Sequence, residues 1–249
     1  RVPIDRMPDL ATRCARLPGI RLNGIAVHIG SQITELGPME AAYLKVIEMT
    51  DALRAAGHTI TRADFGGGLG VPYVMNEAPP PSPAEYGAMV SRISAGKNLK
   101  LAFEPGRLIV ANAGILVTRV VYVKHGASRD FLILDAGMND LIRPAMYDAH
   151  HDLIPVVASD RAERAYDIVG PVCETGDTFA RGRTVPAFEA GELAAILTAG
   201  AYGAAQASEY NARPLVAEAM VNGSDWAIVR PRPSYEEMLG RDRLPDWLG

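Results

Sequence analysis

The first half of the chain alternates short apolar runs with apolar residues at helical spacing. Residues 25–29 form a run typical of a β-strand, and the apolar spacing over residues 39–53 predicts an α-helix that Gly57 ends. Two further apolar runs follow, one ending at Phe65 and one over residues 99–103. This alternation is typical of βα units that build a parallel sheet.

The helix of the second βα unit has a distinct start signal. Ser82 is followed by Pro83 at the first helical position and by Glu85 three residues later, which is the pattern of a capping box. The predicted buried face of this helix consists of Tyr86, Met89, Val90 and Ile93.

The second half of the chain changes to a strand-like pattern. Residues 115–123 and 131–134 are typical of β-strands, and residues 125–128 between them are typical of a turn. We therefore predict an α/β domain over residues 1–112 and a mostly antiparallel, β-rich domain over residues 113–249. Three or four βα units cannot close an eight-stranded barrel, so the α/β domain is expected to be a partial one.

Composition and charge restrict the possible functions. The 249 residues are 48% hydrophobic and 22% charged with a formal net charge of −4, which predicts a globular protein without a nucleic-acid partner. The longest apolar stretch, residues 108–123, is interrupted by polar residues and is shorter than the roughly 20 residues of a membrane span. Two cysteines, Cys14 and Cys173, and no signal-peptide pattern favour a cytoplasmic location without a disulfide framework.

Each of the three apolar runs of the first half ends in an unusual cluster. The clusters are residues 28–31 (HIGS), 66–70 (GGGLG) and 104–107 (EPGR). All three are expected in loops at the carboxyl ends of strands, and in barrels that face carries the active site. Their shared position in the topology predicts one joint site.

The glycine cluster favours a phosphate over a dinucleotide. A dinucleotide fingerprint that begins at Gly66 would need glycine or alanine where Val71 stands, and one that begins at Gly68 would need it where Tyr73 stands. No Gly-Lys-Ser/Thr of a P-loop is present. Adjacent glycines can let several backbone N–H groups converge on one phosphate. The alternative is a tight turn without a ligand.

The ionisable candidates are open to two interpretations each. Glu104 closes an apolar run, where a buried carboxylate needs a partner such as a pyridinium, although a structural pair with Arg107 would also serve. His28 taken alone is more typical of a structural histidine. His150 and His151 lack a spaced third ligand, so we predict a solvated loop there and no metal site.

The chain resembles the diaminopimelate decarboxylases, a branch of the pyridoxal-phosphate-dependent decarboxylases with an alanine-racemase-like barrel. The resemblance rests on motifs that occur in the family order over almost the whole chain from about Ile20 onward. These are HIGSQITELGP (28–38), FGGGLG (65–70), EPGR (104–107), LDAGMNDLIRPAMY (134–147), GPVCETGD (170–177) and GAYGAAQASEYNARP (200–214).

This resemblance implies a fold, a reaction and a cofactor. The fold is the carboxyl-terminal part of a (β/α)8 barrel of TIM type that binds pyridoxal 5'-phosphate, followed by the antiparallel domain. The reaction is decarboxylation of meso-2,6-diaminopimelate to L-lysine and CO2 in lysine biosynthesis. The implied cofactor-binding residues are His28, Ser31, Gly66, Gly67, Gly68, Glu104, Pro105, Gly106, Arg107 and Tyr202.

Within that set, the resemblance gives each residue a role. His28 would stack on the cofactor ring and Ser31 would lie beside the phosphate. The three glycines, the backbone of residues 104–107 and the Tyr202 hydroxyl would hold the phosphate. Glu104 would pair with the pyridinium nitrogen.

The resemblance also implies how an amino-acid substrate is held. The implied substrate-binding residues are Arg107, Arg143, Tyr147, Glu174 and Tyr202. The two arginines and Tyr147 would clamp the carboxylate remote from the reacting carbon, and Glu174 would take the remote amino group. Cys173 would be the catalytic proton donor. Cys173 and Glu174 would reach in from the partner subunit of a homodimer with shared active sites.

One feature departs from the family pattern. The Schiff-base lysine of the family lies near the start of the barrel, in a stretch that this chain does not contain. Its four lysines lie on or near predicted helices (Lys45, Lys97), at the start of a strand (Lys100) and before a turn (Lys124). We therefore expect a chain that is incomplete at its start.

Other functions remain open on the sequence alone. One is a decarboxylase of another diamino acid, and another is a non-catalytic regulatory relative that keeps the fold. For Cys173, the alternative to a catalytic thiol is an ordinary buried cysteine in a surface turn.

Overall fold

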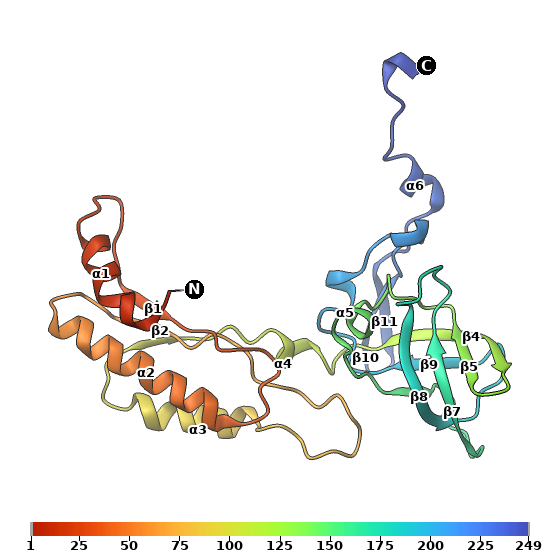
Figure 1. The fold of residues 1–249 in the computed structure, drawn as a ribbon, viewed down its shortest axis with the longest axis horizontal. Coiled ribbons are helices and arrows are strands. Elements are labelled where there is room, and N and C mark those ends of the chain that lie inside the picture. Colours follow the sequence, from red (N-terminus) through yellow and green to blue (C-terminus); the bar gives the residue numbers. More distant parts are fainter. Residues whose placement is uncertain (1, 249) are drawn as a thin grey trace. The chain divides into compact units, whose positions relative to one another are not determined.

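The computed structural model describes residues 2–248 and separates into two compact units (Figure 1). The first unit comprises the residues up to Pro72 and Asn76–Val110. The second comprises Tyr73–Met75 and the residues from Ala111 onward. Each unit contains a hydrophobic core of its own.

The first unit alternates helices and strands, as the apolar pattern predicts. Its strands are only three residues long and pair in parallel in the order β1-β2-β3. The elements are the 3-10 helix η1 (Ile4–Arg6), α1 (Met7–Ala15), β1 (Gly24–Ala26), α2 (Leu36–Ala55), β2 (Arg62–Asp64), α3 (Pro83–Ser94), β3 (Lys100–Ala102) and α4 (Arg107–Val110).

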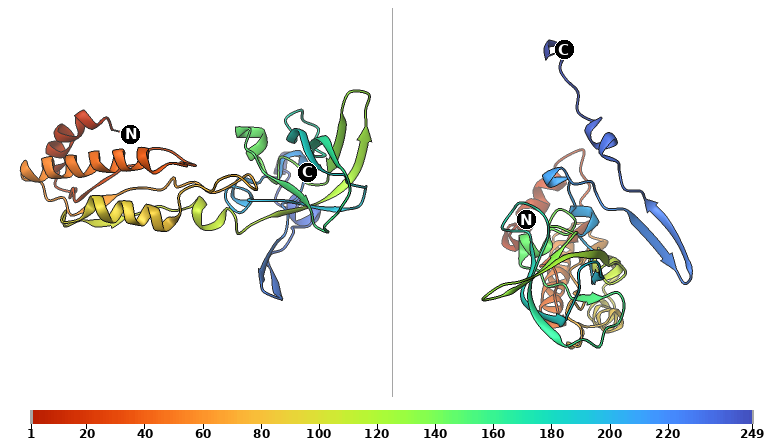
Figure 2. Two further views of the ribbon diagram at one scale, coloured as in Figure 1. Left: turned by 90° about the horizontal axis from the view of Figure 1, so that it is seen from below. Right: turned by 90° about the vertical axis from the view of Figure 1, so that its right-hand side faces the viewer.

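Helices α2 and α3 pack against each other and against the parallel sheet (Figure 2). Tyr43 of α2 is buried and stacks on Phe65 with ring centroids 4.2 Å apart. Its hydroxyl lies 3.1 Å from that of Tyr86 in α3, and burial raises the pKa of Tyr43. This shared core fixes the loops that follow β1, β2 and β3, because those strands lie directly beneath the two helices.

The predicted capping box of α3 is confirmed. The Glu85 backbone N–H donates to the Ser82 hydroxyl at 3.2 Å, and the Ser82 N–H donates to the Glu85 carboxylate at 2.8 Å. Met89, Val90 and Ile93 are buried as predicted, whereas Tyr86 is only half-buried.

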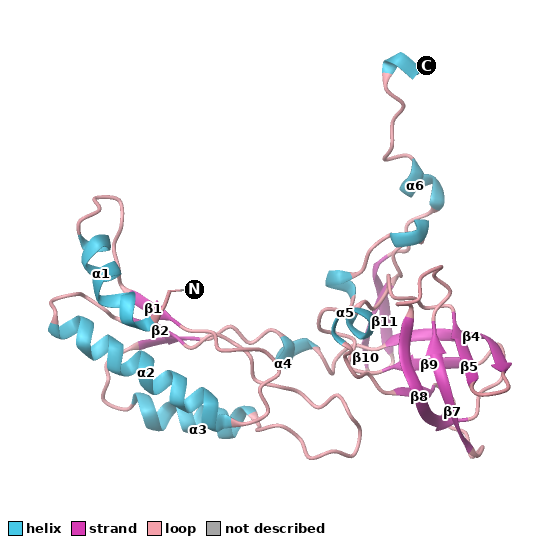
Figure 3. Cartoon of the chain, viewed as in Figure 1, coloured by secondary structure: helices cyan, strands magenta, loops and turns pink. Residues whose placement is uncertain are grey.

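The second unit is built mainly of β-structure (Figure 3). Six strands form one sheet in the order β6-β9-β4-β5-β7-β8, in which only β5 and β7 pair in parallel. The mostly antiparallel sheet that the sequence predicts is therefore confirmed. The sheet strands are β4 (Leu116–His125), β5 (Asp130–Leu134), β6 (Leu153–Pro155), β7 (Glu163–Val169), β8 (Thr178–Pro186) and β9 (Leu193–Ile196).

The remaining elements of the second unit are one helix between β5 and β6 and a series of short elements after β9. A two-stranded antiparallel hairpin forms separately from the six strands. The elements are α5 (Arg143–Tyr147), η2 (Ala204–Gln206), η3 (Tyr210–Ala212), β10 (Glu218–Asn222), β11 (Asp225–Arg230), α6 (Tyr235–Leu239) and η4 (Asp246–Leu248). Among the described helices, none combines the length and the apolar character needed to cross a membrane.

Candidate cofactor and substrate site

The three loops that follow β1, β2 and β3 are joined to one another by backbone hydrogen bonds. The N–H of Glu104 donates to the carbonyl of Gly66 at 2.9 Å, which links the third loop to the second. The N–H of Ile33 donates to the carbonyl of Gly68 at 2.8 Å, which links the first loop to the second. The sequence predicts this meeting of the three motifs at one sheet edge, and the structure confirms it.

Glycine is required at each position of the central loop. A Cβ atom would lie 2.4 Å from the Val27 carbonyl oxygen at Gly66, 2.2 Å from that of Glu104 at Gly67, and 2.3 Å from that of Gly30 at Gly68. Gly66 and Gly68 also adopt φ of +66° and +108°, in the left-handed region that favours glycine. The loop is therefore a tight cradle made of backbone, with neighbouring loops on both sides.

Polar side chains lie beside this cradle. A Cβ atom on Gly66 would be 3.2 Å from His28 Nδ1, so the imidazole lies directly against the glycine loop. Arg107 Nη2 donates to the Ser31 hydroxyl at 3.0 Å, which connects the first and third loops through side chains. His28 and Glu104 are both exposed. Glu104 lies two residues after the end of β3, within residues 103–106, which are all exposed.

A pocket of about 240 Å³ adjoins the glycine cradle. Gly66, Gly67 and Gly68 line one part of it, and the turn of Pro105, Gly106 and Arg107 lines another. Aromatic rings from Tyr86 and Phe103 contribute to its wall. The space beside the cradle can thus take a group with a flat, partly apolar face.

The four lysines lie where the sequence predicts, away from the strand-end loops. Lys45 is on α2, and Lys97 follows α3 and pairs with Asp51 at 2.8 Å. Lys100 is the first residue of β3, and Lys124 is in β4 with its ammonium 5.7 Å from the Phe131 ring centroid.

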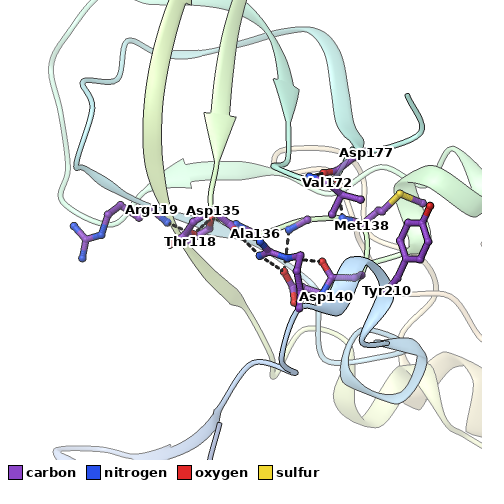
Figure 4. A network of polar contacts seen from close by, with 12 residues as sticks. Thr118, Arg119, Asp135, Ala136, Met138, Asp140, Val172, Asp177 and Tyr210 are labelled. Carbon is purple, nitrogen blue, oxygen red and sulfur yellow. Dashed lines mark hydrogen bonds and ion pairs between the residues drawn. The ribbon is translucent and has the colours of Figure 1, made fainter. Parts of the chain in front are cut away.

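In the second unit, the turn after β5 is the centre of a hydrogen-bond network (Figure 4). The Asp135 carboxylate accepts from the Thr118 hydroxyl at 2.7 Å and from the Arg119 backbone N–H at 2.8 Å, both in β4. The Thr118 hydroxyl accepts from the Ala136 N–H at 3.0 Å. These bonds fix the chain where it leaves the sheet and leads to Arg143 in α5.

A second carboxylate ties this turn to the loop that carries Cys173. Asp177 is 3% exposed, and its two oxygens accept from the Met138 N–H at 2.7 Å and the Val172 N–H at 2.6 Å. Burial raises the pKa of the Asp177 carboxyl, while these two hydrogen bonds act in the opposite direction. A Cβ atom on Gly170 would lie 2.4 Å from the Asp177 carboxylate, so the loop closes tightly on this side chain.

A third segment joins the same turn through Asn139. The Ser208 N–H donates to the Asn139 carbonyl at 2.9 Å, and Arg213 Nε donates to the Asn139 side-chain oxygen at 3.0 Å. Arg213 Nη2 also donates to the Asp135 carbonyl at 2.6 Å. Residues 134–147, 170–177 and 200–214, three of the motif segments, are thus held together by one network.

Arg143 and His151 form a buried pair in the second unit. Their side chains are 8% and 4% exposed, and Arg143 Nη1 lies 2.7 Å from His151 Nε2. The prediction of a solvated loop at 150–151 is therefore wrong for His151, which packs beneath α5 and bonds to the carbonyl of Leu197. Across the described residues, no group of three or more His, Cys, Asp or Glu side chains is arranged to hold a metal ion.

The other predicted substrate residues lie on the surface of the second unit. Tyr147 and Tyr202 are 60% and 42% exposed, and Cys173 and Glu174 are also exposed. The alternative of an ordinary buried cysteine is therefore wrong for Cys173. Tyr202 has a φ of +61°, an uncommon conformation for a residue with a side chain.

Sequence reasoning missed the residues that support this site. Asp177, Asn139 and Arg213 all fall inside the quoted motifs, but no pattern in the sequence shows that they contact one another. The signal that could have found Asp177 is its position directly after Gly176 in a loop that also begins with Gly170. A carboxylate there is suited to accept the loop's own N–H groups.

The fold combines an α/β unit, whose strand-end loops meet at one sheet edge, with a mostly antiparallel sheet unit that follows it in the chain. The family model described as "Pyridoxal-dependent decarboxylase, C-terminal sheet domain" matches residues 28–200. The chain belongs to this family of pyridoxal-dependent decarboxylases.

Similar proteins carry a more specific name. The diaminopimelate decarboxylase of Zymomonas mobilis subsp. mobilis is 50% identical over 236 residues, covering 95% of this chain and 56% of that protein. That of Pseudomonas fluorescens is 46% identical over 246 residues, covering 98% and 58%. The chain therefore spans little more than half the length of these relatives.

Solved structures show the same similarity. A protein from Aquifex aeolicus gives a TM-score of 0.93 at 39% identity, covering 96% of this chain and 59% of that one. The diaminopimelate decarboxylase of Helicobacter pylori, in complex with L-lysine, gives a TM-score of 0.89 at 34% identity with the same coverage of both chains.

Proposed function

We propose that this chain is the portion of a pyridoxal-phosphate-dependent enzyme that holds the cofactor phosphate and ring and the substrate. The proposed reaction converts meso-2,6-diaminopimelate to L-lysine and CO2. The observation that carries the proposal is the joining of the three motif loops at one sheet edge, where the glycine cradle, His28 and Arg107 lie together.

In this proposal the first 112 residues form part of a (β/α)8 barrel, and residues 113–249 form the β domain with the substrate and dimer contacts. The parallel order β1-β2-β3 and the helices α2 and α3 packed on the sheet support the first assignment. The six-stranded sheet supports the second.

The residues of the first unit fit pyridoxal phosphate. The backbone cradle of Gly66 to Gly68 and the turn of residues 105–107 would hold the phosphate, since both line the same pocket. His28 would lie on the ring face, and Ser31 would reach the phosphate region beside Arg107. The Tyr202 hydroxyl would complete the phosphate site. In this proposal none of the four lysines of the chain forms the Schiff base, since none lies in a strand-end loop.

Bound pyridoxal phosphate supplies an electron-accepting ring that takes up the electrons released when the bond to CO2 breaks. Glu104 would hold a proton on the pyridine nitrogen of this group. Because the Glu104 carboxylate after β3 is exposed, it could pair with a cationic ring without first losing a buried contact.

Arg107 of the first unit and Arg143 of the second would bind the distal end of the substrate. Arg107 and Arg143 present guanidinium groups, which recognise carboxylates with two parallel hydrogen bonds, and Tyr147 adds a hydroxyl. Glu174 would take the remote ammonium, and Cys173 would deliver a proton to the carbon that loses CO2. The exposure of Cys173 and Glu174 on a loop closed by Asp177 supports delivery to a partner subunit in a homodimer.

Replacing Glu104 with Ala is expected to lower turnover by about 100-fold or more, because the ring nitrogen loses the carboxylate that keeps it protonated. Cofactor occupancy, measured by absorbance after gel filtration, should stay near the wild-type value. Wild-type turnover in Glu104→Ala would contradict the pyridinium role and favour a structural role for this carboxylate.

Replacing Arg143 with Lys is expected to raise the KM for diaminopimelate by about 10- to 100-fold, because the charge remains but the planar fork is lost. Steady-state kinetics in the holoenzyme measure this. An unchanged KM would place the specificity determinant elsewhere and favour a decarboxylase of a different diamino acid.

A further inference from the structure

The environment of Arg143 contains a buried hydrogen bond between two basic side chains. Arg143 Nη1 lies 2.7 Å from His151 Nε2, and both residues are buried. An arginine side chain is always protonated and has only donors, so Nε2 must be the acceptor in this contact. A ring nitrogen that accepts carries no proton.

The second ring nitrogen of His151 fixes the tautomer. Nδ1 lies 2.8 Å from the Leu197 carbonyl oxygen, which can only accept. His151 is therefore neutral, with its proton on Nδ1 and a lone pair on Nε2. The ring acts as a polar bridge from the end of β9 to the guanidinium of Arg143.

The face of the same guanidinium is covered by an aromatic ring. The Arg143 Cζ lies 4.7 Å from the ring centroid of Tyr73, a distance typical of a cation–π contact. Tyr73 and His151 meet edge to face, with centroids 5.3 Å apart and planes at 87°. His151 thus contacts one edge of the Arg143 guanidinium and Tyr73 covers one of its faces. Together they fix the plane of the guanidinium.

We infer that His151 is a positioning residue for substrate selection: as a neutral hydrogen-bond acceptor it sets the orientation in which Arg143 receives the remote carboxylate. This inference rests on the proposed function, in which Arg143 binds that carboxylate. Bidentate recognition needs the plane of the guanidinium to match the plane of the carboxylate. A histidine that holds one edge of the fork reduces the rotamer entropy that Arg143 would otherwise lose on binding.

Two substitutions separate this role from simple packing. Gln can place its side-chain oxygen near the position of Nε2 and so keep an acceptor for Arg143. Asn reaches only as far as the position of Nδ1, so it can keep the donor to the Leu197 carbonyl but leaves Arg143 Nη1 without this acceptor. If His151 served only for packing, both His151→Asn and His151→Gln would lower the stability of the protein, and neither would selectively weaken carboxylate binding.

The experiment measures substrate kinetics and product inhibition of the holoenzyme carrying His151→Asn or His151→Gln. For His151→Asn, we expect about a 10-fold rise in KM for diaminopimelate with kcat within about twofold of wild type. Inhibition by L-lysine, which keeps the remote carboxylate, should weaken by a similar factor. Inhibition by cadaverine, which has no carboxylate, should not change. His151→Gln should stay within about threefold of wild type in all four values.

The adjacent histidine gives a matched control. The side chain of His150 contacts Asp152 and Arg183, so His150→Gln should leave the ratio of L-lysine to cadaverine inhibition unchanged. Thermal unfolding of each variant reports any general loss of stability. If His151→Asn does not fold, His151→Gln still tests the inference. Because Gln keeps an acceptor for Arg143, a folded His151→Gln protein that L-lysine inhibits 10-fold more weakly than wild type would overturn the acceptor role.

A further variant distinguishes failure of the inference from failure of the proposed function. Arg143→Ala should weaken L-lysine inhibition more than His151→Asn does. If Arg143→Ala has no effect on L-lysine, the proposed role of Arg143 is wrong. Suppose that Arg143→Ala weakens inhibition by L-lysine. If His151→Asn then weakens inhibition by L-lysine and by cadaverine equally, or changes neither, only the positioning role of His151 is overturned.

Discussion

Mixing two inactive variants, Cys173→Ala and Glu104→Ala, is expected to restore about one quarter of the wild-type activity per subunit. The proposed dimer forms each active site from the strand-end loops of one subunit and the Cys173 loop of the other. Random mixing makes about half of the dimers mixed, and one of the two sites in each mixed dimer then has both Glu104 and Cys173. The change from almost no activity to a quarter is the largest effect that the proposal predicts.

The control mixes two variants on the same side of the proposed site. Glu104→Ala with Arg107→Ala places one defect in the strand-end loops of every subunit, so no mixed dimer gains an intact site. A mass tag on one variant shows that mixed dimers have formed. Mixed dimers of Cys173→Ala and Glu104→Ala that remain inactive would show that Cys173 acts within its own subunit or has no catalytic role.

Replacing Asp177 with Ala is expected to lower the free energy of unfolding by about 2 to 5 kcal/mol, because the buried N–H groups of Met138 and Val172 both lose their acceptor. Hydrogen exchange followed by mass spectrometry should show faster exchange in the peptides that contain these two amides. Asp160→Ala removes an exposed aspartate of the same unit and should leave exchange unchanged. Unchanged exchange in Asp177→Ala would contradict the anchoring role of Asp177.

The charge of Asp177 also predicts a pH dependence of stability. Because burial raises the pKa of this carboxyl in the folded protein above its ordinary value of 3.8, the folded state binds this proton more tightly than the unfolded state. The contribution of Asp177 to stability therefore falls as the pH rises from the unfolded pKa through the folded pKa. Asp177→Asn should lose this pH dependence, which the difference between the two unfolding free energies at several acidic pH values would show.

Local signals in the sequence predicted much of the fold. The capping box of Ser82 and Glu85 depends on residues three positions apart, so a short window contains all the information. The alternation of strands and helices in the first unit and the change to β-structure after residue 113 depend on apolar periodicity, which is also local. The meeting of the three motif loops followed from the rule that parallel strands end at one sheet edge.

The parts that the sequence did not predict depend on contacts between distant segments. His151 is buried because the Leu197 carbonyl, 46 positions later, supplies a partner for its ring. Asp177 is buried because its carboxylate accepts a hydrogen bond from the backbone N–H of Met138, 39 positions earlier. Burial of such polar groups is favourable only when the tertiary structure provides their partners, and no periodicity in the chain reports those partners.

The most direct test of the proposed function is product analysis with the purified holoenzyme. With meso-2,6-diaminopimelate as substrate, we expect CO2 and L-lysine to form in equal amounts, and we expect L-lysine offered as a substrate to yield no cadaverine. Formation of cadaverine from L-lysine, or no CO2 from diaminopimelate by a protein that retains pyridoxal phosphate, would contradict it.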